Sequence, residues 1–183
     1  FGVTLAGHGH SGFPLKVKAE EPGVYLIQAS IKFLADSKQG EAAIQELPVV
    51  ALYPGQVMAF DTEDAVCVVS SRNAFEIRRE GGRLISFDLE SDRWLGEIAA
   101  EYGPPFDPSE FRFRKAELSW RQDAGNVVVT SEQVSERFSG LTLLRELHFT
   151  GGPLVRAVYR TLNRGEKAHS PEFAQRFARD WSE

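Results

Sequence analysis

Aromatic side chains gather in one stretch of the chain that also contains acidic residues. Trp94, Tyr102 and Phe106 flank a loop rich in proline, and Glu110 follows them. An aromatic surface beside a few polar groups is typical of a site that binds a small polar ligand such as a sugar. These four residues are therefore the candidate ligand-binding set. The alternative is that their rings seal the edge of a β-sheet structure.

Several carboxylates in the same stretch raise the question of acid–base catalysis. They are Glu97, Glu101, Asp107 and Glu110. A glycosidase needs two carboxyl groups at a set separation across a cleft, and that separation depends on the fold rather than on the sequence. Solvated loop charges are the simpler interpretation, so no catalytic pair is predicted from these residues.

Two further residue types could bind a metal or act as a nucleophile. His8 and His10 are one residue apart, so an extended backbone would point both imidazoles the same way, but no Asp or Cys lies close in sequence to complete a site. We therefore predict no metal and no other cofactor. The single cysteine, Cys67, lies in the apolar run AVCVV, and we interpret it as a small buried side chain rather than a reactive thiol.

The composition indicates an ordinary globular chain and argues against two classes of partner. The 183 residues are 42% hydrophobic and 26% charged, with a formal net charge of −5. Residues 111–118 predict a strand, and over its first four residues phenylalanine alternates with arginine, as in some nucleic-acid-binding proteins. The acidic balance of the chain nevertheless disfavours nucleic acid as a partner. No apolar run reaches the roughly 18 residues that a membrane-spanning helix needs. We expect neither nucleic acid nor a membrane as a partner.

Apolar residues alternate with polar ones through most of the chain, and this period predicts an all-β fold. The clearest case is 141–163, where two alternating arms joined by Gly151-Gly152-Pro153 predict a β-hairpin. Residues 74–89 predict a second hairpin around Gly81-Gly82. We therefore expect an antiparallel β-sandwich.

Two segments depart from this period and predict helices. In residues 91–102 apolar side chains recur at i, i+1, i+4 and i+5, from Trp94 to Ala99. In residues 171–181 three aromatic residues follow one another at intervals of four: Phe173, Phe177 and Trp181. Ser170 and Pro171 favour a helix start before them. We expect this apolar stripe to dock on a neighbouring domain or on a second copy of the chain.

A change of composition near residues 61–64 suggests two parts. Residues 1–63 have immunoglobulin-like strands, which can also belong to the same sandwich, and residues 64–183 form a β-sandwich with the C-terminal helix. The chain begins at Phe1, without an initiator methionine and already within an apolar segment. We therefore expect a fragment or a domain of a longer protein.

Three segments carry a resemblance to a known family. They are Gly81 to Ser86, Phe138 to Leu141, and Val155 to Glu166, which ends in an aromatic-x-Leu-Asn-x-Gly pattern. With them, residues 75–166 resemble the galactose-mutarotase-like supersandwich, a β fold of sugar epimerases and of accessory domains in glycoside hydrolases. In such epimerases a histidine after this strand acts as the general acid on the ring oxygen, so the resemblance implies that role for His169.

The sequence thus leaves three functions open. The first is a non-catalytic β-sandwich module of a larger, carbohydrate-active protein that offers a structural, sugar-binding or partner-binding face. The second is a mutarotase-like epimerase that uses His169. The third is an interaction domain that docks through the C-terminal helix and its stripe of Phe173, Phe177 and Trp181.

Overall fold

The structure is a computed structural model that describes residues 18–28, 30–35, 38–43, 47–91, 93–102, 110–152, 154–169 and 173–178. Over these residues the regular elements are antiparallel β-strands and one short 3-10 helix, η1 (Glu110–Arg112). The predicted all-β class is therefore confirmed. Within the described residues no helix is long and apolar enough to cross a membrane.

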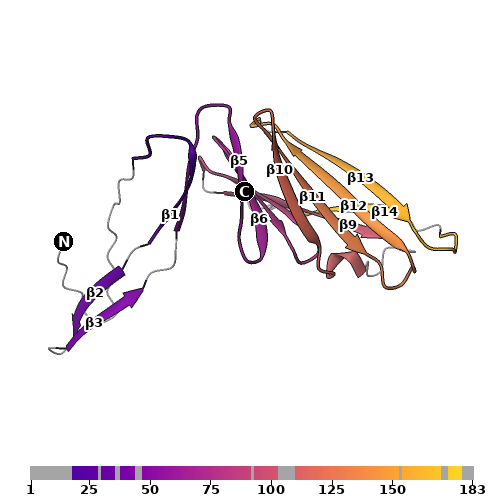
Figure 1. Cartoon of the computed structure of the whole chain (residues 1–183), viewed down its shortest axis with the longest axis horizontal. Helices are drawn as coiled ribbons and strands as arrows, with labels where there is room; N and C mark the ends of the chain where they lie inside the picture. Colours follow the sequence, from indigo (N-terminus) through magenta and orange to yellow (C-terminus); the bar gives the residue numbers. More distant parts are fainter. Residues whose placement is uncertain are drawn as a thin grey trace.

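Two larger sheets make up most of the structure (Figure 1). The six-stranded sheet has the order β14-β9-β8-β7-β6-β5 and the four-stranded sheet has the order β10-β11-β12-β13. The strands of the first are β5 (Val57–Asp61), β6 (Ala65–Ser70), β7 (Asn73–Arg78), β8 (Leu84–Asp88), β9 (Arg93–Tyr102) and β14 (Phe173–Ala178). Those of the second are β10 (Glu117–Asp123), β11 (Asn126–Val134), β12 (Leu141–Phe149) and β13 (Val155–Asn163).

The two sheets face each other across a common apolar core. Strands β5 to β8 contribute one side of it, with residues such as Val66, Val68 and Ile77, which are fully buried. Strands β11 and β12 contribute the other side. The rings of Phe75 and Phe149 meet between the layers, with centroids 5.0 Å apart and planes tilted by 51°. Burial of these side chains is the main stabilising contribution that joins the sheets.

The structure contains both hairpins that the alternation of apolar and polar residues predicts. Strands β12 and β13 pair from Leu141 with Asn163 to Phe149 with Val155, and β7 pairs with β8. In β12 the buried residues include Leu141, Leu143, Leu147 and Phe149, which share one parity. Alternation puts these side chains on the face toward the other sheet, so the sequence pattern and the packing agree.

The helix predicted over residues 91–102 is wrong for residues 93–102, which form strand β9, paired with β8 on one side and β14 on the other, and residue 92 lies outside the described residues. The predicted C-terminal helix over residues 171–181 is wrong for residues 173–178, which form β14. Residues 171, 172 and 179–181 lie outside the described residues. A spacing of four residues fits one turn of helix and also fits two repeats of a strand, so the apolar stripes were compatible with both.

The strand predicted over residues 111–118 is also partly wrong. Its first residues belong to η1, and β10 begins at Glu117. Phe111 is buried whereas Phe113 is 63% exposed, so the two rings do not share a face. Phe111 packs against Leu143 and Tyr159 of the four-stranded sheet, a long-range contact that local alternation does not reveal.

Four strands precede the two large sheets. They form two separate pairs, β1 (Gly23–Ile27) with β4 (Leu47–Ala51) and β2 (Ser30–Ala35) with β3 (Lys38–Ala43). Figure 1 shows β2 and β3 projecting away from the two large sheets. The boundary suggested near residues 63–64 falls in the turn that joins β5 to β6, and the division of the chain into two parts stays a prediction.

Candidate functional site

The predicted ligand-binding residues do not form one aromatic surface. Trp94 pairs with Phe87 at one end of β9, and Tyr102 pairs with Phe173 at the other end. Tyr102 is the eighth residue after Trp94 along the strand, which places them roughly 26 Å apart at 3.3 Å per residue. Phe106 lies outside the described residues. The sugar-binding role of this set stays a prediction.

Glu110 holds a neighbouring loop. Its Oε2 accepts hydrogen bonds from the backbone N–H groups of Glu136 at 3.3 Å and Arg137 at 3.2 Å. Its Oε1 is buried and has no hydrogen-bond partner among the described residues. The carboxylate therefore anchors the connection between β11 and β12 to η1.

His169 contacts that same connection. Its Nε2 lies 3.3 Å from the carbonyl oxygen of Ser139, and its ring meets the ring of Phe138 edge-on at a centroid distance of 5.4 Å. Both contacts fix the imidazole after the end of β13. A role as general acid stays a prediction.

A buried polar cluster joins the two sheets at one end. Arg145 is 3% exposed and lies in the inward-facing row of β12, where its Nη2 donates to the carbonyl oxygen of Gly82 in the β7–β8 turn. Gln133 donates through Nε2 to the carbonyl oxygens of Phe111 at 2.8 Å and Arg114 at 3.0 Å. These bonds clamp the β7–β8 turn and the segment after η1 onto the four-stranded sheet.

The electrostatics of this cluster follow from its burial. Burial lowers the pKa of the Arg145 guanidinium, and Tyr159 partly offsets the effect. The Nε of Arg145 has no hydrogen-bond partner among the described residues. Sequence reasoning missed this cluster, although Arg145 shares the parity of Leu143 and Leu147 in its strand, a signal that could have marked it as inward-facing.

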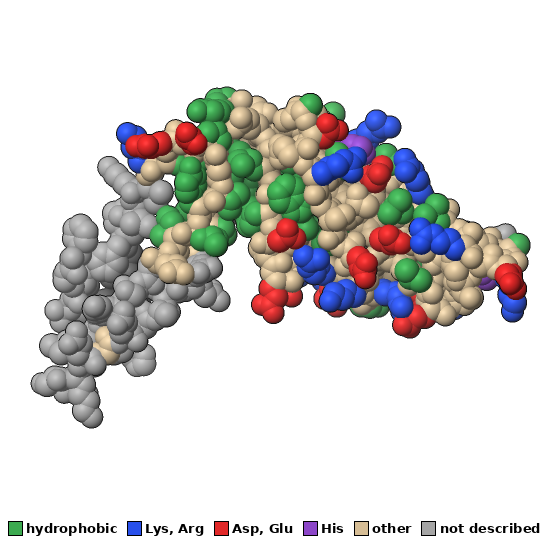
Figure 2. All heavy atoms as spheres, viewed as in Figure 1, with side chains coloured by type: hydrophobic (Ala, Val, Ile, Leu, Met, Phe, Trp, Pro, Cys, Tyr) green, Lys and Arg blue, Asp and Glu red, His purple; other side chains and the backbone are tan. Residues whose placement is uncertain are grey.

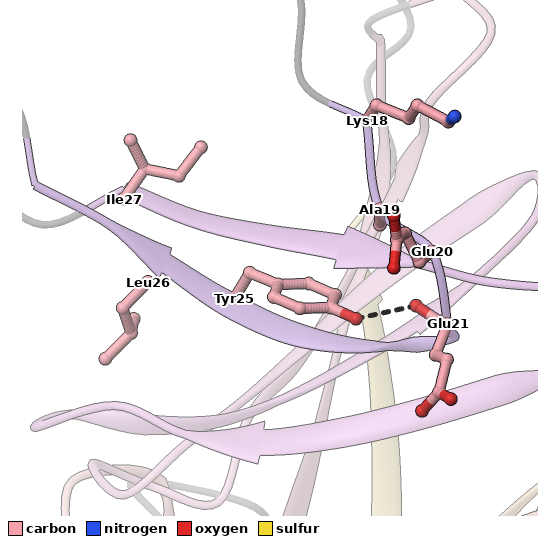
Figure 3. Close-up of a pocket in the computed structure, with 7 residues that line it drawn as sticks. All are labelled: Lys18, Ala19, Glu20, Glu21, Tyr25, Leu26 and Ile27. Carbon is pink, nitrogen blue, oxygen red and sulfur yellow. Dashed lines mark hydrogen bonds between the residues drawn. The ribbon is translucent and has the colours of Figure 1, made fainter.

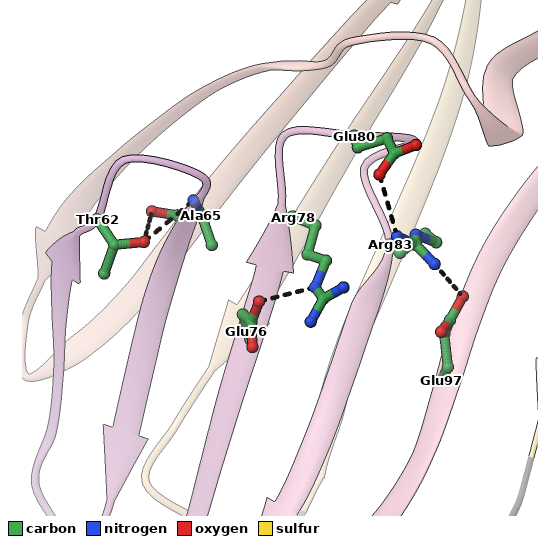
Figure 4. Close-up of polar contacts among 7 residues, drawn as sticks. All are labelled: Thr62, Ala65, Glu76, Arg78, Glu80, Arg83 and Glu97. Atoms are coloured by element: carbon green, nitrogen blue, oxygen red, sulfur yellow. Dashed lines mark hydrogen bonds and ion pairs between the residues drawn. The ribbon is translucent and has the colours of Figure 1, made fainter.

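Ion pairs lie on β7, on the β7–β8 turn and on β9 of the six-stranded sheet (Figure 4). Figure 4 shows Arg83 between two carboxylates, with its nitrogens 3.4 Å from Glu80 and 3.5 Å from Glu97. Glu76 and Arg78 pair at 2.8 Å on the neighbouring strand. The carboxylate of Glu97 is thus already matched by a cation of its own sheet.

Cys67 lies in β6 and is half-buried. Burial raises the pKa of its thiol to about 11, and the nearby carboxylates of Glu76 and Asp61 add to the rise. The thiol is therefore protonated at neutral pH. The described residues contain no group of three or more His, Cys, Asp or Glu side chains that could hold a metal ion, and His8 and His10 lie outside them.

An open hollow of about 550 Å³ is lined by β1 and by the residues just before it, Lys18 to Glu21. Figure 3 shows that the Tyr25 hydroxyl closes one side by donating to the carbonyl oxygen of Glu21, at 2.7 Å. Large hydrophobic side chains are exposed on and near β1 and β4, namely Tyr25, Leu26, Leu47 and Tyr53. In Figure 2 hydrophobic side chains gather over this part of the surface, whereas charges of both signs mix over the opposite part.

The free edge of β14 is the candidate site with the clearest geometry. β14 ends the six-stranded sheet, and among the described strands it pairs with β9 alone. Phe177 lies opposite Ile98, which packs against the core, yet Phe177 itself is 68% exposed. A second hollow, of about 260 Å³, adjoins this edge and is lined by Glu97, Ala99, Arg112, Arg176, Phe177 and Ala178. Phe177 belongs to the predicted partner-binding set, of which Trp181 lies outside the described residues.

Comparisons with known proteins identify no relative of this chain at a significant level. No family model matches the sequence, and no curated protein or solved structure matches the chain at a significant level. The resemblance to the galactose-mutarotase-like supersandwich therefore stays a prediction.

Proposed function

We propose that this chain is a non-catalytic β-sandwich module of a larger protein, and that it binds an extended polypeptide segment at the free edge of β14. The observation that carries the proposal is the exposure of Phe177 on the terminal strand of the six-stranded sheet. A terminal strand offers a row of backbone N–H and C=O groups to a further strand. The exposed ring beside them offers apolar surface that an added strand would bury.

The energetic argument favours occupation of this edge. Burial of a large apolar side chain contributes about 2 kcal/mol, and strand addition supplies backbone hydrogen bonds as well. Natural sheet edges are commonly protected by charge, and β14 carries Arg176. The same strand nevertheless exposes Phe177, which makes this edge attractive to a partner.

Partner binding is favoured over the two sugar-related functions. Sugar binding as expected from the sequence needs Trp94 and Tyr102 on one surface, whereas they lie at opposite ends of β9. An epimerase needs a histidine that faces a substrate, whereas the described contacts of His169 are with Ser139 and Phe138. The resemblance to the supersandwich family is the reason for proposing that the larger protein acts on carbohydrates.

A selection from displayed random twelve-residue peptides tests the proposal. Peptides that are enriched on the wild-type chain are synthesised, and their affinity is measured for Phe177→Lys and for Leu154→Lys. Leu154 is a matched control because it is 79% exposed and lies in the loop before β13. We expect Phe177→Lys to weaken binding about tenfold or more and Leu154→Lys to leave it unchanged. No enriched peptide, or equal binding to both variants, would contradict the proposal.

A further inference from the structure

We infer that the segment added at β14 alternates apolar and polar residues, and that its apolar side lies on the same face of the sheet as Phe177 and continues the core. The inference rests on the proposed strand addition and names the chemistry of the partner. Its basis is a row of cross-strand neighbours that begins in the core and ends at Phe177.

The burial of this row decreases toward the free edge. Its members lie opposite one another on neighbouring strands, and they are Val66, Ile77, Leu84, Ile98 and Phe177. The first three are buried, Ile98 is half-buried and packs against the core, and Phe177 is 68% exposed. Cross-strand neighbours point to the same face of a sheet. Phe177 is therefore a core-facing residue without cover, and the next residue of the row would come from an added strand.

The other end of the same row is closed by charge. On β5 the row ends at Asp61, which lies opposite Val66. The carboxylate of Asp61 accepts a hydrogen bond from the indole N–H of Trp120 at 2.8 Å and pairs with Arg79 at 3.1 Å. A charged residue is a common protection of a sheet edge. The row is thus protected at β5, whereas at β14 it ends in an exposed aromatic ring.

The four-stranded sheet also leaves its core-facing side open at this end. The bond between Trp120 of β10 and Asp61 of β5 brings β10 beside β5, so β13 ends the smaller sheet on the side where β14 ends the larger one. Leu147 on β12 is 1% exposed, whereas its cross-strand neighbour on β13, Ala157, is exposed. The core is therefore uncovered at the terminal strands of both sheets on this side.

The opposite face of β14 sets the polar side of the partner. On that face Ala178 lies opposite Glu97, which pairs with Arg83 at 3.5 Å. This face carries charge next to the edge, and Ala178 offers only a methyl group. Successive residues of a strand point to opposite faces. A segment that is apolar on the Phe177 side and polar on the Ala178 side would bury its apolar residues and keep its polar ones in water.

A foreign segment fits this edge better than a second copy of the chain. The strand β14 has six residues, so a partner can place three residues on the core-facing side. In β14 itself Gln175 shares the parity of Phe177, so a second copy would bring a polar residue into the middle of that side. Both copies would also carry the formal net charge of −5. A foreign segment with apolar residues at alternate positions has neither disadvantage.

The first test locates the two sides of a selected peptide on wild-type β14. Isotope-edited NMR should show contacts between apolar side chains of the peptide and the ring of Phe177, and none with the methyl group of Ala178. Ala178→Lys is the matched variant, because Ala178 is exposed and follows Phe177 on β14 but lies on the opposite face. We expect Phe177→Lys to weaken binding about tenfold or more and Ala178→Lys by less than about twofold.

The second test keeps the composition of the peptide. One apolar residue of a selected peptide is exchanged with the polar residue next to it, which moves the apolar side chain to the other face of the added strand. We expect the exchanged peptide to bind wild type about tenfold more weakly than the selected one.

The outcomes separate this inference from the proposed function. Peptides that slow amide exchange in β14 but contact Ala178 instead of Phe177, or that bind equally well after the exchange of residues, would overturn the alternating partner and keep the strand addition. Failure to select any peptide would overturn both. Light scattering tests the remaining occupant. A dimer of the wild type that Phe177→Lys abolishes and a selected peptide dissociates would identify a second copy and overturn the foreign segment.

Discussion

Two regions of the molecule depart in opposite ways from the usual separation of apolar and charged residues. Arg145, which contacts the β7–β8 turn between the two sheets, is only 3% exposed. Phe177, on the terminal strand β14, is 68% exposed. The buried charge has a partner within the chain, since it donates to the carbonyl oxygen of Gly82. The exposed ring lies on a strand whose outer side pairs with no described strand. The buried charge is thus paired inside the fold, whereas the exposed ring is the basis of the proposed binding surface.

Arg145→Ala should give the largest loss of stability. The substitution removes the bond to Gly82 and leaves a cavity at a buried position, so we expect a cost of about 3 kcal/mol in the free energy of unfolding. Urea denaturation measures it. Arg145→Met is the control, because an apolar chain of similar volume fills the site without a buried charge and should cost less. An alanine variant as stable as wild type would contradict the stabilising role of the bond between Arg145 and Gly82.

Gly82→Ala should cost about 2 kcal/mol. A Cβ atom at this residue would lie 2.9 Å from Ser131 Oγ and 3.2 Å from Arg145 Nη2, and its φ is +56°. Gly125→Ala is the matched control, with φ at +84° and no atom within 4 Å of its Cβ. It should cost about 1 kcal/mol, from the backbone alone. Equal losses in the two variants would mean that the contacts with Ser131 and Arg145 contribute nothing.

Cys67 tests burial on β6, which adjoins the terminal strand β5 on the side of the six-stranded sheet away from β14. Its pKa is raised from 9.0 to about 11, so the folded state holds the thiol proton more tightly than the unfolded state does. The stability from this protonated thiol is fully present below pH 9 and is lost as the pH rises toward 11. Denaturation at several pH values, with Cys67→Ala as the reference, should show this difference. Alkylation at pH 8 as fast as that of a free cysteine would contradict it.

Phe177→Lys should have the smallest effect on stability, below about 0.5 kcal/mol, because the ring is already exposed. Its effect should fall on peptide binding instead. Urea denaturation of this variant beside Leu147→Ala, a core residue that is 1% exposed and should cost about 3 kcal/mol, sets the scale. A large loss for Phe177→Lys would place the ring in the fold rather than in a binding surface.

The sequence predicts those parts of the fold that local alternation determines. The hairpins at 74–89 and 141–163 are predicted by the alternation of apolar and polar residues, and in β7 and β12 buried residues share one parity, such as Phe75 with Ile77 and Leu143 with Leu147. The helices over 91–102 and 171–181 were wrong because apolar residues four apart are compatible with both structures. The 3-10 helix at Glu110 was missed because Phe111 is fixed by Leu143 and Tyr159, which lie far away in sequence.

The candidate site could be predicted only in part. The aromatic spacing predicted Phe177 as part of a partner-binding stripe on a helix, whereas its place on the terminal strand of a sheet follows from pairing with β9, which depends on the whole fold. The arginines of the adjacent hollow come from η1 and β14, more than sixty residues apart by their numbers, so no local pattern joins them. Arg145 shows the converse case, since its parity with Leu143 and Leu147 is a local signal that could have found a buried charge, although it was missed.

Hydrogen exchange of the backbone amides in β14 is the most direct test of strand addition. The amides of residues 173–178 are compared with those of β5, the terminal strand on the other side of the same sheet, with and without a saturating selected peptide. Strand addition predicts slower exchange at alternate amides of β14 and no change in β5, because a new strand bonds the outward-pointing N–H groups. Unchanged exchange in β14 with the peptide bound, or protection at β5 instead, would contradict it.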